Sequence, residues 1–302
     1  MDTILEPFRI MKQMELRFNE HQTVPYMKWF FPSCFVFSTI YLVIIFGGTY
    51  LMRYKEPYQL RRALCMWSTG LSAFSFIALI KTLPWAYERW QMGGVEFLSC
   101  DLTFLTGSCG VGLWSFMFMF SKLPELGDTI FIVLRKGHIS FLHWYHHISV
   151  MCYTWWSYAY PIAPGIMFGM INYMVHAIMY AYYAVKASGR NPPRWVARCI
   201  TILQLSQMFL GIYWNYIAIR ALWEGRMCAM NHFNMQLCIV MYVSYAILFA
   251  NFYYWTYIKK KPKGGPKAPA EKKEDAPVTS VKEMLNGSLP QNGFIHHRTV
   301  NH

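Results

Sequence analysis

The stretch FLHWYHHISVMCYTWWSY, residues 141–158, carries no formal charge yet contains three histidines. Its apolar and aromatic content suits the hydrocarbon core of a bilayer, which a helix of about 20 mostly apolar residues can cross. His143, His146 and His147 stand at positions i, i+3 and i+4, so a helix brings all three imidazoles to one face. The stretch therefore predicts a membrane helix that presents one polar face.

The composition of the whole chain points to the same class of protein. Of the 302 residues, 55% are hydrophobic and 14% are charged, whereas about a quarter of the residues of a soluble domain are charged. The net charge of +13 could indicate a nucleic-acid partner. The basic residues lie in short clusters between apolar runs and in a tail, however, which membrane topology explains better. The eight cysteines form no CxxC pair, which argues against a zinc site.

Seven apolar runs are long enough to cross a bilayer, namely residues 30–52, 63–83, 108–134, 139–157, 166–187, 199–221 and 235–257. We therefore expect an all-α integral membrane protein whose seven transmembrane helices form one domain at residues 29–258. Residues 1–28 lack the uninterrupted apolar run of a signal peptide, so we expect the first span to direct insertion. Residues 259–302 are rich in Lys, Pro, Gly and Glu and predict a disordered basic tail.

The distribution of Lys and Arg predicts the orientation. The connections after spans one, three, five and seven are richer in basic residues than those after spans two, four and six. Because basic connections stay on the cytosolic side of a membrane, we expect the C-terminus in the cytosol and the N-terminus on the luminal side.

The third span contains KLPELGDT, residues 122–129, inside an otherwise apolar run. Charged groups are costly at membrane depth and usually face a cavity or one another, so Lys122 is expected to neutralise Glu125 or Asp128. Pro124 and Gly127 are expected to bend or loosen the helix there. The alternative is that residues 122–128 form a solvated cytosolic loop.

The fifth and sixth spans also carry polar faces. Asn172, His176, Met179, Tyr180 and Tyr183 form one stripe at helical spacing, and Thr201, Gln204 and Gln207 repeat every three residues. A single polar stripe in a membrane helix more often serves hydrogen bonding between helices. Four neighbouring spans with polar faces instead predict a polar chamber inside the bundle.

Two chemistries compete for the histidines. HxxHH can bind iron or zinc, but a di-iron site needs more ligands than His143, His146, His147 and His176 supply at depth. A neutral imidazole, which burial favours, can instead attack a thioester and pass the acyl group on. Cys152 is a rival nucleophile in the same span, but it lies off the histidine face and is expected to serve packing.

Four segments together resemble the motifs of the very-long-chain fatty acid elongases, the ELO family. They are KLPELGDT (122–129), HWYHH (143–147), NYMVHAIMYAYY (172–183) and TILQLSQ (201–207), in the family's order and spacing. The resemblance spans about residues 28–260. It implies a seven-helix protein of the endoplasmic reticulum membrane with a catalytic chamber facing the cytosol and an acyl tunnel. It also implies condensation of a long-chain acyl-CoA with malonyl-CoA to 3-oxoacyl-CoA, CO2 and CoA.

The resemblance implies roles for individual residues. His146 would carry the acyl group covalently, His143 and His147 would act as base or orienting partners, and His176 would be a second participant. No cofactor is expected, because decarboxylation drives the reaction. Lys122, Gln204 and Tyr180 are expected to stabilise enolate or carbonyl oxygens. The full set of expected substrate-binding residues is Lys122, Glu125, Asp128, Asn172, Met179, Tyr180, Tyr183, Gln204 and Gln207.

Two further expectations concern the ends of the spans. Cys100 and Cys228 fall in luminal connections and are expected to form a disulfide, with Cys109 as the competing partner. Basic residues at the cytosolic end could bind CoA phosphates or could simply signal topology. They are Arg135, Lys136, Lys186, Arg190 and Arg194.

The chain is most similar to the subgroup that elongates saturated and monounsaturated long chains, the elongase 6 type, and His138 replaces a Gln typical of polyunsaturated-chain elongases. The expected partners are acyl-CoA, malonyl-CoA, membrane lipid and the reductase, dehydratase and enoyl reductase of the elongation cycle, with a homo-oligomer left open and no nucleic acid. Two other functions stay open at this point. One is a seven-span lipid transporter or receptor, and the other is a metal-dependent membrane lipid oxidoreductase.

Overall fold

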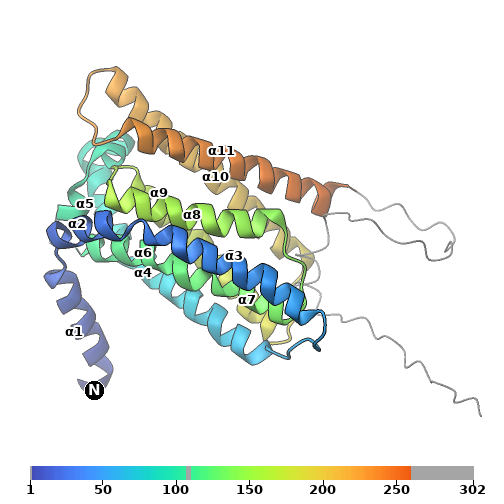
Figure 1. Cartoon of the computed structure of the whole chain (residues 1–302). Coiled ribbons are helices and arrows are strands. Elements are labelled where there is room, and N and C mark those ends of the chain that lie inside the picture. Colours follow the sequence, from blue (N-terminus) through green and yellow to red (C-terminus); the bar gives the residue numbers. More distant parts are fainter. Residues whose placement is uncertain (1, 107–109, 260–302) are drawn as a thin grey trace, which may run out of the picture.

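The computed structural model describes residues 2–106 and 110–259, and these residues form helices and no strand. The elements are α1 (Asp2–Arg17), α2 (Glu20–Phe30), α3 (Ser33–Met52), α4 (Arg61–Cys100), α5 (Thr103–Thr106), α6 (Val111–Glu125), α7 (Gly127–Leu134), α8 (Phe141–Ala159), α9 (Gly165–Ala187), α10 (Arg194–Trp223), α11 (His232–Tyr253) and the π-helix η1 (Tyr254–Ile258). Figure 1 shows the long helices running alongside one another as a bundle. The predicted tail lies outside the described residues, except for Lys259.

Four helices are long and apolar enough to cross a membrane: Ser33–Met52, Arg61–Cys100, Arg194–Trp223 and His232–Ile258. They correspond to the first, second, sixth and seventh predicted spans. The expectation of an all-helical, multi-pass membrane protein is therefore confirmed over the described residues. The other three predicted spans, α6–α7, α8 and α9, contain the Lys, Glu, Asp and His residues that lower their hydropathy.

The second predicted span, 63–83, is too short. In the structure α4 continues to Cys100, with a kink at Gly93 and Gly94, where Gly94 has the positive φ of 65° that glycine adopts without strain. The apolar run stops near Lys81, but the helix continues beyond it, and Lys81 pairs with Glu15 of α1 at 3.0 Å.

The third predicted span is divided into α6 and α7 at Leu126, next to the Pro124 and Gly127 that predicted a bend. Close packing requires the glycine, since a Cβ at Gly127 would lie 2.7 Å from the Trp67 ring. The side chains of this segment are not solvated. Lys122 is 2% exposed and Glu125 is 4% exposed, so the alternative of a solvated loop is wrong.

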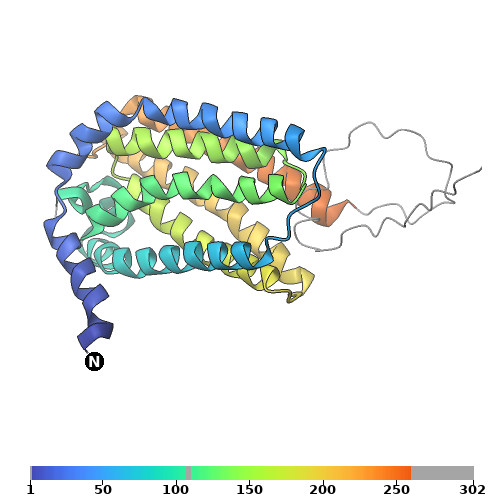
Figure 2. The same cartoon turned by 60° about the horizontal axis from the view of Figure 1, so that its bottom comes forward.

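The helices place the connections at two opposite ends of the bundle. One end, here called the basic end, contains residues 53–60, 135–140 and 188–193 and the end of η1. The other end contains α1, α2, α5 and the loops 160–164 and 224–231, and is called the paired end. Figure 2 shows the N-terminal helices at the paired end, away from the α3–α4 connection.

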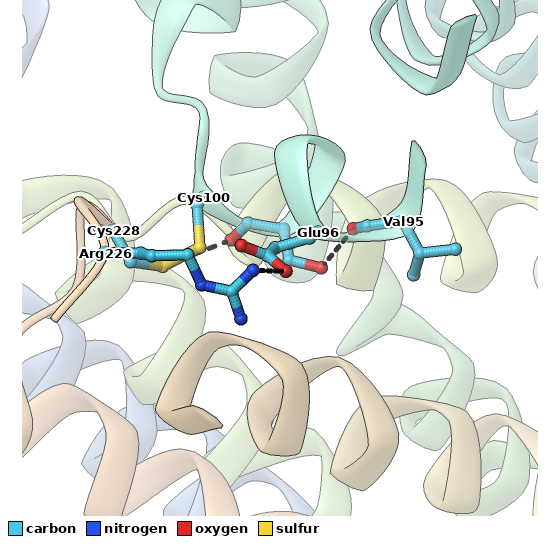
Figure 3. Close-up of a disulfide and its surroundings, with 6 residues drawn as sticks. Val95, Glu96, Cys100, Arg226 and Cys228 are labelled. Carbon is cyan, nitrogen blue, oxygen red and sulfur yellow. Dashed lines mark hydrogen bonds and ion pairs between the residues drawn. A yellow bond between two sulfur atoms is a disulfide. The ribbon is translucent and has the colours of Figure 1, made fainter. Parts of the chain in front are cut away.

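At the paired end a disulfide joins Cys100, at the end of α4, to Cys228 in the loop between α10 and α11, with a Cα–Cα distance of 4.4 Å. This is the pairing that the predicted luminal positions favoured. Figure 3 shows the disulfide beside the ion pair of Arg226 with Glu96. Cys109, the competing partner, lies outside the described residues.

Candidate active site

A narrow cavity of about 30 Å³ lies between α6, α8, α9, α10 and α11. Its lining combines aromatic and aliphatic side chains with a few polar ones. The lining residues are Phe118, His146, Val150, Tyr153, Thr154, Phe168, Asn172, Gln207, Met208, Met241, Tyr242 and Tyr245. Polar groups from three of the four motif segments therefore meet at one small cavity.

His146 is the one histidine of the four candidates that lines this cavity, within the part of the chain that the structure describes. Its ring packs against Tyr245 and Phe249 of α11, with ring centroids 4.9 Å and 6.2 Å away. Neither ring nitrogen has a hydrogen-bond partner among the described side chains. The imidazole is thus held in place by packing and keeps its nitrogens available for chemistry.

The other two histidines of α8 make different contacts. His143 Nε2 lies 2.8 Å from the Thr129 hydroxyl, which lies 2.6 Å from the Tyr41 hydroxyl of α3. The ring of His147 packs 4.4 Å from that of His143, and its buried Nδ1 has no hydrogen-bond partner among the described residues. His143 is therefore tied to a hydroxyl pair, whereas His147 packs between its two neighbours.

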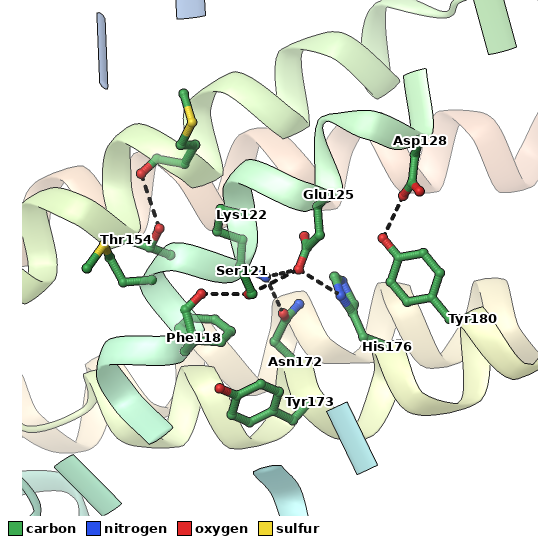
Figure 4. Close-up of polar contacts among 12 residues, drawn as sticks. Phe118, Ser121, Lys122, Glu125, Asp128, Thr154, Asn172, Tyr173, His176 and Tyr180 are labelled. Atoms are coloured by element: carbon green, nitrogen blue, oxygen red, sulfur yellow. Dashed lines mark hydrogen bonds and ion pairs between the residues drawn. The ribbon is translucent and has the colours of Figure 1, made fainter. Parts of the chain in front are cut away.

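His176 belongs to a buried charge cluster between α6 and α9 (Figure 4). Lys122 Nζ donates to Glu125 Oε1 at 2.7 Å and to Asn172 Oδ1 at 2.9 Å. His176 Nδ1 lies 3.4 Å from the same Glu125 oxygen. Because a buried charge is tolerated only when it is paired and hydrogen-bonded, these contacts explain how Lys122 and Glu125 can lie inside the bundle. Of the two carboxylates expected as partners of Lys122, Glu125 is the one with which it pairs.

Asp128 makes a separate set of contacts. Its two carboxylate oxygens accept hydrogen bonds from Tyr180 OH at 2.6 Å and from Trp67 Nε1 at 2.7 Å. Figure 4 shows Asp128 and Tyr180 apart from the Lys122 cluster. The two halves of KLPELGDT therefore have different partners. Lys122 and Glu125 contact α9, whereas Asp128 and Thr129, beyond the break at Leu126, contact side chains of α3, α4, α8 and α9.

Tyr41 and Trp67 are site residues that sequence reasoning missed. Each is an ordinary aromatic residue in an apolar span, and nothing in its spacing distinguishes it from a packing residue. Their roles follow only from the side chains that they contact, Thr129 and Asp128.

The structure divides the expected substrate-binding residues into two groups. Asn172 and Gln207 line the cavity with His146, whereas Gln204 and Tyr180 do not. The amide nitrogen of Gln204 instead lies 3.1 Å from the sulfur of Met179, and Tyr180 donates to Asp128. Tyr183 packs against Tyr180, with ring centroids 6.1 Å apart. The roles predicted for Gln204 and Tyr180 at the reacting oxygens stay predictions.

The predicted CoA-phosphate residues all lie at the basic end, near the start of α8 and the histidines. They are Arg135, Lys136, Lys186, Arg190 and Arg194. Two of them make local polar contacts: Lys136 Nζ with the Arg53 carbonyl at 3.4 Å, and Lys186 Nζ with Asn191 Oδ1 at 3.2 Å. None of the five forms an ion pair with a described carboxylate, so their charges remain available to an anion.

The structure also bears on the two other chemistries considered for α8, a cysteine nucleophile and a metal site. Cys152 lies 3.6 Å from the Ser38 hydroxyl on the side that faces α3, away from the cavity lining. Within residues 2–106 and 110–259, no three His, Cys, Asp or Glu side chains are grouped so that they could hold a metal ion.

Comparison with known proteins places the chain in a family. The ELO family, described as the GNS1/SUR4 family, matches residues 26–265. Very long chain fatty acid elongase 6 of Gallus gallus is 39% identical over 251 residues, which cover 83% of this chain and 94% of the relative. The protein of the same name from Homo sapiens is 39% identical over 252 residues, with the same two coverages of 83% and 94%. Putative fatty acid elongase 3 of Caenorhabditis elegans is 34% identical over 293 residues, covering 95% of this chain and 91% of the relative.

The match begins within α2 and extends through η1, so it includes all four motif segments and the cavity that they line. The chain therefore belongs to the ELO family of fatty acid elongase proteins.

Proposed function

We propose that this protein is a 3-oxoacyl-CoA synthase, an acyltransferase that condenses a long-chain saturated or monounsaturated acyl-CoA with malonyl-CoA. The reaction is the first step of the fatty acid elongation cycle. The names of the relatives, very long chain fatty acid elongase 6 among them, support the pathway and the substrate class. The observation that carries the proposal is the position of His146, whose unengaged imidazole lines the cavity.

In the first stage His146 takes the acyl group. The lone pair of its unprotonated ring nitrogen forms a bond to the thioester carbon, and the carbonyl electrons move onto oxygen. When the carbonyl re-forms, the carbon–sulfur bond breaks and CoA leaves as a thiolate. The proton on the other ring nitrogen passes to that thiolate, so the stage yields a neutral acyl-imidazole and free CoA.

In the second stage malonyl-CoA loses CO2, and the electrons of the broken carbon–carbon bond become an enolate. The enolate carbon attacks the acyl-imidazole carbonyl, and His146 leaves and regains a proton from water. The products are 3-oxoacyl-CoA and regenerated enzyme, with one proton consumed. Loss of CO2 drives the condensation, and for that reason we propose no cofactor.

The neighbouring histidines take supporting roles in this scheme. A carboxylate beside Nδ1 favours the tautomer that carries its proton there, so Glu125 leaves His176 Nε2 as an acceptor. We propose that this nitrogen accepts the proton from the His146 ring and passes it to the leaving thiolate, so His176 is unchanged at the end of the stage. His143, bonded to Thr129, and His147, packed against His143, keep the α8 imidazoles in position.

Substrate binding must widen the cavity. Its volume of about 30 Å³ is close to the volume that one molecule occupies in liquid water, which is far less than an acyl chain requires. The lining is mostly side chains of separate helices, so an acyl chain can enter by turning side chains and separating α8 from α10 and α11.

The membrane arrangement is part of the proposal. We propose seven transmembrane helices in the endoplasmic reticulum membrane, with α6–α7, α8 and α9 completing the four more apolar helices. The basic end faces the cytosol and receives the CoA phosphates, the N-terminus is luminal and the C-terminus is cytosolic. The partners are then the reductase, dehydratase and enoyl reductase that act on the 3-oxoacyl product.

The test uses the purified full-length protein in detergent with palmitoyl-CoA and malonyl-CoA. CO2 release and a 3-oxoacyl-CoA product are expected, and the absence of both would reject the proposal. Binding of acyl-CoA without conversion would favour the transporter or receptor, and stoichiometric iron or zinc with oxidised lipid product would favour the oxidoreductase.

The acyl-enzyme is tested with palmitoyl-CoA alone. Intact mass should show one added palmitoyl group in the wild type and none in His146→Ala, while His138→Ala, at an exposed position near the start of α8, should behave as wild type. An adduct that persists in His146→Ala and maps to Cys152 would overturn the assignment of the nucleophile.

A further inference from the structure

We propose that the side-chain amides of Asn172 and Gln207 donate the hydrogen bonds that stabilise the oxyanion formed beside His146. The inference rests on the condensation proposed above and adds two residues that touch the reacting atoms. Asn172 comes from α9, Gln207 from α10 and His146 from α8, and all three line the same cavity. An oxyanion site requires donors that are fixed before the charge develops.

The contact with Lys122 fixes the direction of the Asn172 amide. Lys122 Nζ lies 2.9 Å from Asn172 Oδ1. An ammonium group can only donate hydrogen bonds, so the amide oxygen must face Lys122 and the NH2 group must face away from it. No described group accepts a hydrogen bond from that NH2. Asn172 therefore directs two unused donors toward the cavity.

Gln207 is a buried amide without a hydrogen bond. Its side chain is 8% exposed and lines the cavity, and none of its polar atoms pairs with a described residue. Because the Gln207 side chain lines the cavity and makes no hydrogen bond to a described residue, its NH2 group can donate to a developing negative charge on a substrate there.

Lys122 is too enclosed to serve as the donor itself. Its side chain is 1% exposed, its ammonium already donates to Glu125 and Asn172, and the Phe118 ring lies 4.4 Å below it. Lys122 does not line the cavity. It is a positioning residue, which fixes the Asn172 amide and polarises its N–H bonds.

Both chemical stages need this donor pair at the same place. As the His146 nitrogen adds to the thioester carbon, the carbonyl oxygen becomes an oxyanion, and it becomes one again when the enolate adds to the acyl-imidazole. The two amides donate to that oxygen in each stage and are unchanged when the carbonyl re-forms. Removing one donor from an oxyanion site typically lowers kcat by about 10²–10³.

Gln207→Met and Gln91→Met provide a matched pair of variants. Gln207→Met removes the donor in the cavity, whereas Gln91→Met makes the same chemical change at an exposed side chain of α4, outside the cavity lining. Asn172→Asp removes the two donors but keeps an oxygen for Lys122, so the contact that holds α6 to α9 is retained. The measurements are the rate of palmitoyl adduct formation with palmitoyl-CoA alone, and its half-saturating concentration.

Gln207→Met and Asn172→Asp are each expected to slow adduct formation about 100-fold or more, with little change in the half-saturating palmitoyl-CoA concentration. Gln91→Met should remain within threefold of the wild type. Wild-type rates in both cavity variants would overturn the inference while leaving the proposed function intact. Failure of the wild type itself to form adduct or product would instead overturn the proposed function, and the inference with it. Thermal unfolding of each variant separates lost catalysis from lost folding, since the folded fraction normalises every rate.

Discussion

The two ends of the helix bundle differ in whether their basic side chains have carboxylate partners. At the paired end, Lys12, Arg17 and Lys28 of α1 and α2 form no ion pair with a described residue, but four other basic side chains do: Lys81–Glu15, Arg89–Asp101, Arg220–Glu224, and Arg226 with Glu96 and Glu224. At the basic end, the cationic side chains have no carboxylate partner among the described residues. They include Arg53, Arg61, Arg135, Lys136, Arg190 and Arg194.

This difference suggests that the charges at the two ends serve different purposes, namely packing of the helix ends at one and attraction of anions at the other. Charges that are already neutralised, together with the disulfide, keep the helix ends of the paired end together. Unpaired cations raise the local potential and attract anions such as the phosphates of CoA. The buried Lys122–Glu125 pair lies between the two ends. Its side chains are 1% and 5% exposed, so solvent screens this pair less than it screens the charges at either end.

The largest expected effect comes from Lys122→Met. It leaves Glu125 buried without its cation, which should lower the free energy of unfolding by about 3–5 kcal/mol. The matched variant at the paired end, Lys81→Met, removes a lysine that is 33% exposed and should cost about 1 kcal/mol or less. Denaturant unfolding in detergent micelles measures both. Equal losses for the two variants would remove the distinction between the buried pair and the pair at the end.

Loss of the disulfide should be the next largest effect. Cys100→Ser or Cys228→Ser opens a link between residues separated by 128 positions, and removing such a link typically costs about 2–4 kcal/mol. Activity per folded molecule should not change, because the bond lies at the paired end. Cys199→Ser, at an exposed free cysteine, is the control. Peptide mapping without reductant that finds Cys100 and Cys228 as free thiols would contradict the pairing.

A smaller effect is expected in the cavity lining. The Cβ of Gly211→Ala would lie 2.4 Å from ring atoms of Tyr242, which lines the cavity. The ring must move, at a cost of about 1–3 kcal/mol for overpacking, and the chain-length preference should shift toward shorter acyl-CoAs. Gly169→Ala is the control, since its Cβ would make an ordinary 3.6 Å contact with Phe118. An unchanged product profile in Gly211→Ala would show that Tyr242 does not limit the acyl chain.

The smallest effect is expected at the basic end. Arg190→Gln and Arg194→Gln should each raise the KM for malonyl-CoA a few-fold, since a contact between exposed charges contributes up to about 1 kcal/mol. The difference from wild type should shrink at high salt, which screens exposed charges. Arg220→Gln, at the paired end, should leave KM unchanged. A similar rise in KM for all three variants would argue against CoA binding at the basic end.

Much of the fold and part of the site could be predicted from the sequence. Membrane class depends on apolar content and segment length, and the break near Pro124 depends on local backbone chemistry. A contact between Lys122 and Glu125 could be predicted from the sequence, because side chains three residues apart lie on the same face of a helix. The four motif segments also indicated the family, which the match over residues 26–265 confirms.

Only the tertiary structure decided which polar side chains meet. Gln204 and Gln207 look equivalent in the sequence, but one contacts Met179 and the other lines the cavity with His146. Tyr41 and Trp67 belong to the site only because α7, which carries Thr129 and Asp128, packs against the helices that contain them. Helical spacing fixes the direction of a side chain about its own axis, but it does not specify which neighbouring helix lies there or at what depth. The sequence by itself thus determined a membrane bundle with polar faces, and packing between helices determined the oxygen-stabilising pair that we propose.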